Sequence, residues 1–116
     1  MKIEPNFDKN VYVISLQGKL ISQPEVEDLY SHFRRLRDQK IVNVILDLEL
    51  LDWMGSVGLG ALISCVTTIR KSGGDVRLTN LNYKLKNLLS ITKLDRVFQI
   101  FESVELAAQS FHTITH

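Results

Sequence analysis

The hydrophobic pattern of the chain alternates between the period of a β-strand and that of an α-helix. Residues 11–18, VYVISLQG, alternate tightly, are rich in β-branched and aromatic side chains and stop at Gly18, which predicts a strand. Residues 2–7, KIEPNF, form a weaker strand candidate, which Pro5 would confine to the edge of a sheet. The DKN segment at residues 8–10 suits the hairpin turn between these two strands.

Residues 22–39 follow with the signals of an amphipathic helix. Ser22 can cap its start, Pro24 suits the first turn, and the acidic residues that follow are favoured there by the helix dipole. The apolar residues at helical spacing are Val26, Leu29, Tyr30, Phe33 and Leu36. Residues 41–48, IVNVILDL, are almost continuously apolar, which is typical of a central strand covered on both faces.

The second half of the chain continues the alternation. After a turn around Ser56, helical spacing predicts a helix that ends at the glycines of KSGG; its apolar positions are Leu59, Leu62, Ile63, Val66 and Ile69. The remaining elements are a strand, a helix, a strand and a helix capped by Ser103, over residues 75–80, 83–92, 96–101 and 103–111. The order indicates βαβ units in one α/β domain over residues 1–116, with a mixed, mostly parallel sheet of about five strands and about four helices.

Composition and charge narrow the class of function. A formal net charge of +1 over 116 residues gives no electrostatic reason to expect nucleic acid or an anionic membrane as partner. The basic run at residues 32–40 is short and interrupted by Asp38, and we interpret it as the solvated face of a helix. Because there is no secretory h-region and no long apolar segment, and Cys65 cannot form an intramolecular disulfide, we expect a cytoplasmic protein.

Ser56 is the most informative polar residue, because it lies where a buried strand gives way to a helix. A hydrolase nucleophile elbow needs G-x-S-x-G, and Met54 takes the place of the first glycine. No histidine follows a strand, so a catalytic base is not presented and an enzyme is not expected. Nucleotide-binding loops are absent, and His112 and His116 lack a third metal ligand, so we expect neither a cofactor nor a metal.

Two interpretations of Ser56 remain, and the two are compatible with each other. In one, its hydroxyl caps the helix, a contribution of about 1 kcal/mol. In the other, it accepts a phosphate, which the unpaired N–H groups and the dipole of a helix N-terminus tolerate. Gly58 and Gly60, each costing about 1 kcal/mol inside a helix, suggest that a phosphate or another chain approaches the backbone closely.

These features together resemble a STAS domain of the anti-sigma factor antagonist family. The likeness begins at VYVISLQGKL, is strongest in VILDLELLDWMGSVGLGALI and continues to residue 108. The family has an Asp-Ser-x-Gly-Leu-Gly turn after its third strand, which this chain matches at Ser56, Gly58, Leu59 and Gly60. Asp47 matches an aspartate at the end of the preceding strand.

The resemblance implies a regulatory switch. The unphosphorylated domain would bind an anti-sigma factor that is itself a serine kinase, and so release a sigma factor. Phosphorylation of Ser56 would break the complex and a phosphatase would restore it. The implied partner-binding residues are Ile21, Ser22, Gly55, Ser56, Val57, Gly58 and Gly60. Exposed edge strands leave a homodimer open.

The chain departs from the family at two positions. Gly55 stands where the family has aspartate before the acceptor serine, and Ile21 stands where it has an aspartate after the second strand. The first alternative is therefore a STAS scaffold or constitutive binding module that phosphorylation does not regulate, and a serine hydrolase is a more distant one. Trp53 and Met54, just before the turn, are expected in the core.

Overall fold

The computed structural model describes residues 2–8, 11–41 and 43–112. The strands are β1 (Lys2–Asp8), β2 (Val11–Leu20), β3 (Asn43–Asp47), β4 (Leu51–Met54), β5 (Asp75–Thr79) and β6 (Gln99–Phe101). The helices are α1 (Gln23–Asp38), α2 (Ser56–Lys71), α3 (Tyr83–Ile91), the 3₁₀ turn η1 (Leu94–Arg96) and α4 (Val104–His112). Most of the predicted DKN turn lies outside the described residues.

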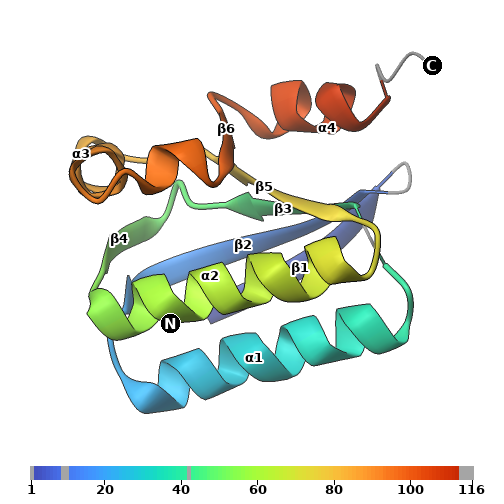
Figure 1. The fold of residues 1–116 in the computed structure, drawn as a ribbon, viewed down its shortest axis with the longest axis horizontal. Helices are drawn as coiled ribbons and strands as arrows, with labels where there is room; N and C mark the ends of the chain where they lie inside the picture. Colours follow the sequence, from blue (N-terminus) through green and yellow to red (C-terminus); the bar gives the residue numbers. More distant parts are fainter. Residues whose placement is uncertain (1, 9–10, 42, 113–116) are drawn as a thin grey trace.

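The sheet has the order β1-β2-β3-β5-β6, and β4 pairs with the far end of β2 (Figure 1). β1 is antiparallel to β2, and the other pairs are parallel. The prediction of a mixed, mostly parallel α/β sheet is therefore confirmed. β1 is at the edge, as Pro5 required, because proline has no N–H to donate to a second neighbour.

Helices cover both faces of the sheet. α1 and α2 lie side by side on one face, and α4 lies across the other (Figure 1). In β3, Val44 and Leu46 belong to the large core, whereas Ile45 belongs to a smaller core with Ala107 and Phe111 of α4. Residues on both sides of β3 are thus fully buried, which explains the near-continuous apolar run in the sequence.

Several strands differ from the sequence expectation. β2 continues past Gly18, its predicted end, to Leu20. β4 was not predicted, because its four residues are too few to display a period and it pairs only with β2, across an irregularity at Gly18. The strand expected over residues 96–101 is shorter, since η1 ends at Arg96 and pairing begins only at Gln99. Met54 is buried and Trp53 half-buried against the core, in line with their expected place.

Two predicted helix starts are confirmed by their hydrogen bonds. Ser22 occupies the N-cap position of α1, and a carboxylate oxygen of Glu25 accepts the N–H groups of Ile21 and Ser22, each at 3.0 Å. At α4, the Ser103 hydroxyl accepts the N–H of Leu106 at 3.1 Å. These contacts satisfy backbone donors that a helix cannot pair internally.

Candidate functional site around Ser56

The site is assembled where β2 and β4 end beside each other. Leu20 is opposite Met54 in the parallel pairing of the two strands. One residue further on, the N–H of Gly55 donates to the carbonyl of Leu20 at 3.1 Å. This hydrogen bond brings together two turns that are more than thirty residues apart in the sequence: the turn leading into α1 and the turn leading into α2.

Gly58 allows α2 to begin against the end of β2. A Cβ at position 58 would lie 2.2 Å from the Leu20 carbonyl oxygen and 2.8 Å from its Cγ, distances that no side chain tolerates. The close approach expected at this glycine therefore exists, and the neighbour is a strand of the same chain. Gly58 is buried, so it shapes the surface from beneath.

Gly60 differs from Gly58, although both belong to the same motif. It is exposed, and apart from its chain neighbours and the adjacent backbone of α2, no atom of the described residues lies within 4 Å of the place a Cβ would occupy. Within this part of the chain, nothing in packing requires glycine there. Its lack of a side chain leaves the helix backbone at the second turn of α2 open to contact from outside.

Ser56 is the first residue of α2, and Gly55 is the N-cap. The expectation that the Ser56 hydroxyl caps the helix is therefore wrong, because the capping position is one residue earlier and carries no side chain. Ser56 is exposed, and no group among the described residues forms a hydrogen bond with its Oγ. The hydroxyl is accessible, next to the unpaired N–H groups of the first helical turn.

The side chains around this hydroxyl are apolar. Ile21 and Val57 are 48% and 47% exposed. A Cβ on Gly55 would lie 3.5 Å from Ile21 Cγ2, so the two positions that depart from the family pattern are neighbours in space. We call the exposed or half-buried residues here the Ser56 surface; they are Ile21, Ser22, Gly55, Ser56, Val57 and Gly60.

One carboxylate lies beside this surface, and its role in the turn was not anticipated from the sequence. The N–H of Ile21 and both polar groups of Ser22 donate to Glu25, and these hydrogen bonds lower its pKa to about 2. The Ser-x-x-Glu spacing, which is that of a capping box, was the available signal. Glu25 thus fixes the backbone that carries Ile21 and Ser22.

Other reactive groups lie elsewhere in the fold. His32 contacts Tyr12 and Arg35 on the far part of α1, and Cys65 is buried, which raises the pKa of its thiol to about 12. Among the described residues, no three His, Cys, Asp or Glu side chains converge on a metal position. His116 and the side chain of His112 lie outside the described residues. In the described part of the chain, no helix combines the length and hydrophobicity needed to cross a bilayer.

Comparison with known proteins identifies the family to which this fold is related. The sequence profile of the STAS domain family matches residues 2–107. A Thermotoga maritima protein, provisionally named an anti-sigma factor antagonist, is 31% identical over 81 residues, which are 70% of this chain and 69% of that one.

Solved structures show the same fold. The unphosphorylated anti-sigma factor antagonist SpoIIAA superposes with a TM-score of 0.75 at 19% identity, covering 97% of this chain and 100% of that one. The phosphorylated form of the Bacillus protein superposes with a TM-score of 0.73 at 19% identity, covering 96% and 99%. The profile match over nearly the whole chain and this common fold lead to one conclusion: the chain belongs to the STAS domain family.

Proposed function

We propose that this STAS domain is an anti-sigma factor antagonist that binds its partner through the Ser56 surface. The observation that carries the proposal is the exposed hydroxyl of Ser56 at the start of α2, with which no described residue forms a hydrogen bond, in a chain whose relatives are named for that role. The partner would be an anti-sigma factor with serine kinase activity, and its capture would release a sigma factor in the cytoplasm. The domain itself would catalyse nothing.

Phosphorylation of Ser56 would end the interaction, and a serine phosphatase would restore it. A phosphate adds about −1.5 to −2 charges at neutral pH. The free N–H groups at the start of α2 would stabilise that charge, so the fold would persist. A partner packed over Ile21 and Val57 would meet a strongly hydrated dianion in an apolar contact, which opposes binding.

The departures from the family pattern support binding mainly through apolar contact. Ile21 and Gly55 stand in place of aspartates, and the carboxylate beside Ile21 and Ser22, that of Glu25, is already held by backbone N–H groups. A phosphate at Ser56 would meet less repulsion here than beside two aspartates. Gly60 would let the partner approach the helix backbone, and Gly58 would hold the surface in place from below.

The same departures favour one alternative, a constitutive binding module. Without the two aspartates, a kinase loses carboxylates that could orient the hydroxyl, and Ser56 would then stay unmodified. A hydrolase has less support, because no described residue accepts a hydrogen bond from Ser56 and could act as its base. A homodimer through an exposed sheet edge is compatible both with the antagonist regulated by phosphorylation and with the constitutive binding module.

The deciding experiment uses an anti-sigma factor kinase from the same genome. Affinity is measured by calorimetry for the wild type, Ser56→Asp and Ser31→Asp, the last adding the same charge on an exposed face of α1. We expect Ser56→Asp to weaken binding about a hundredfold, roughly 2.7 kcal/mol, and Ser31→Asp to bind like the wild type. Intact mass and peptide mapping after incubation with the kinase and ATP should locate one phosphate on Ser56.

Each outcome separates the candidates. Binding of Ser56→Asp at wild-type strength, with Ser56 unmodified, would establish the constitutive module. Equal weakening by Ser31→Asp would place the interface elsewhere, and labelling of Ser56 by a fluorophosphonate would revive the hydrolase.

A further inference from the structure

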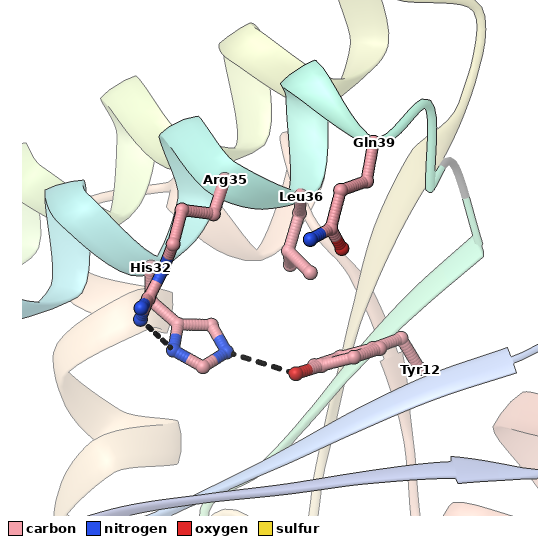
Figure 2. Close-up of a pocket in the computed structure, with 5 residues that line it drawn as sticks. All are labelled: Tyr12, His32, Arg35, Leu36 and Gln39. Atoms are coloured by element: carbon pink, nitrogen blue, oxygen red, sulfur yellow. Dashed lines mark hydrogen bonds between the residues drawn. The ribbon is translucent and has the colours of Figure 1, made fainter.

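A second site candidate lies along the C-terminal half of α1, away from the start of α2. A cavity of about 260 Å³ opens between this helix and β2 (Figure 2). His32, Arg35 and Leu36 lie on one stripe of the helix, and Gln39 follows directly after it as the C-cap. Tyr12 closes the cavity from the strand. The volume is slightly below the range of about 300–1,000 Å³ that is typical of sites for drug-sized molecules, so a smaller ligand would fit it.

The floor of the cavity is a chain of polar contacts between strand and helix. Tyr12 Oη lies 3.2 Å from His32 Nε2, and Arg35 Nη2 lies 3.3 Å from His32 Nδ1 (Figure 2). Burial lowers the pKa of His32, and the positive charge of Arg35 lowers it further, so the ring is neutral at neutral pH. A neutral ring can accept the Arg35 N–H at Nδ1 and direct its Nε2–H to Tyr12.

Arg35 is the charged group of this cavity, and no carboxylate of the described residues pairs with it. Asp38, the acidic residue near the end of α1, contacts Arg37 instead, at 3.3 Å. A guanidinium has five N–H donors in a planar fork, and the contact with His32 uses only one edge of it. The remaining edge is available to an anion.

The other two lining groups complement that charge. The side-chain amide of Gln39 is directed into the space above Tyr12, and none of the described residues forms a hydrogen bond with it (Figure 2). Leu36 is buried in the cavity wall, opposite the ring of Tyr12, so one part of the cavity is apolar. A charged donor, a neutral donor and an apolar wall converge on one space.

We propose that this cavity binds a small molecule with a single carboxylate and an apolar body. The carboxylate pairs with the Arg35 guanidinium and accepts a hydrogen bond from the Gln39 amide, and the apolar body packs between Leu36 and the Tyr12 ring. One unpaired cation matches one carboxylate, and the fork geometry of arginine suits a planar carboxylate. None of the residues that line the cavity belongs to the Ser56 surface.

The test uses benzoate, whose carboxylate and ring match the two parts of the cavity, and benzamide as its uncharged counterpart. Each is titrated into the ¹⁵N-labelled protein while amide resonances are followed by NMR. The variants are Arg35→Gln and Arg34→Gln, which remove the same charge from exposed, adjacent positions of α1; Arg34 lines a different groove, between α1 and α2. Gln39→Ala is a third variant.

We expect saturable shifts for benzoate at residues 12 and 32–39 in the wild type and in Arg34→Gln. Arg35→Gln should weaken binding at least about tenfold, Gln39→Ala by a smaller factor, and benzamide should not saturate. The proposal is overturned by an absence of saturable shifts with benzoate, by an equal response to benzamide, or by equal losses in Arg34→Gln and Arg35→Gln. Shifts centred on the α1–α2 groove would overturn it as well.

Discussion

The carbonyl oxygen of Leu20 lies 2.2 Å from the point where a side chain on Gly58 would begin. Leu20 is the last residue of β2, and Gly58 is the third residue of α2. The same carbonyl accepts the N–H of Gly55 at 3.1 Å, so the strand end and the helix start are joined at one oxygen. The position of Ser56 depends on this junction.

The two glycines of the motif should therefore respond differently to alanine. Gly58→Ala forces a methyl group onto backbone atoms that cannot yield, and we expect a loss of about 2–4 kcal/mol in the free energy of unfolding. Gly60→Ala meets open space and gains up to about 1 kcal/mol of helix propensity. Urea denaturation of both variants measures the difference. Wild-type stability of Gly58→Ala would contradict the close packing of α2 on β2.

Asn82 should stabilise the fold at two places at once. Its side-chain oxygen accepts the N–H of Leu85 at 2.8 Å and so caps α3, while its Nδ2 donates to the carbonyls of Leu51 and Asp52 in β4, each at 3.1 Å. Asn82→Ala should cost about 2–3 kcal/mol, because it removes the cap and leaves two carbonyls without their donor.

Asn82→Asp and Ser103→Ala dissect that effect in the same denaturation assay. The aspartate keeps the capping oxygen but turns its second carboxylate oxygen toward the two carbonyl oxygens that Nδ2 had bonded, so it should be clearly less stable than the wild type although the cap remains. Ser103→Ala removes only a cap, that of Leu106 in α4, and should cost about 1 kcal/mol. An Asn82→Ala loss no larger than this would show that the contacts with β4 add nothing.

Glu25 should make stability depend on pH in the acid range. Its pKa is lowered from 4.5 to about 2, chiefly by the Ile21 N–H, so the ionised form stabilises the folded state. That contribution is complete above about pH 4.5 and is lost as the pH falls toward 2. Glu25→Gln should be less stable than the wild type at pH 7, and the two should converge near pH 2.

Chemical denaturation at a series of pH values tests this, with Glu27→Gln as the control. Glu27 is on the same helix, but within the described part of the chain it accepts a hydrogen bond from the Gln23 side chain alone, at 3.1 Å. A Glu25→Gln profile parallel to that of the wild type between pH 2 and pH 5 would argue against the hydrogen bonds at Ile21 and Ser22.

His32 should also make the stability of the fold depend on pH, at higher pH values than Glu25 does. Because burial lowers its pKa below 6.5, the unfolded chain takes up a proton more readily than the folded protein. The stability that this residue contributes is therefore complete above about pH 6.5 and declines as the pH falls toward the folded-state pKa. NMR titration of the ring should give a midpoint below 6.5.

His32→Gln tests the same point through stability, because it removes the titrating group from between Tyr12 and Arg35. Its free energy of unfolding should vary less between pH 7.5 and pH 5 than that of the wild type. An unchanged slope, or a ring midpoint at or above 6.5, would mean that the imidazole is not desolvated in solution.

Local patterns in the sequence were sufficient for most of the architecture. Apolar residues at period two or at helical spacing located four strands and four helices, because burial of one face imposes those periods, and a near-continuous apolar run located the central strand, which is buried on both faces. Ser22 and Ser103 were recognised as helix starts, since capping depends on residues within one turn. The placement of Ser56 at a strand-to-helix junction followed from the same patterns.

What the sequence could not determine depends on contacts between distant segments. β4 exists because the end of β2 offers it a partner, and no period of four residues could reveal that. Gly58 and Gly60 look alike in the motif, yet only Gly58 meets a strand, and Ile21 meets Gly55 only once two turns converge. The sequence around Ser56 determined that a hydroxyl would lie at the start of a helix. The packing of β2 against α2 decided that Gly55 takes the N-cap position, so the hydroxyl is exposed and no described residue forms a hydrogen bond with it.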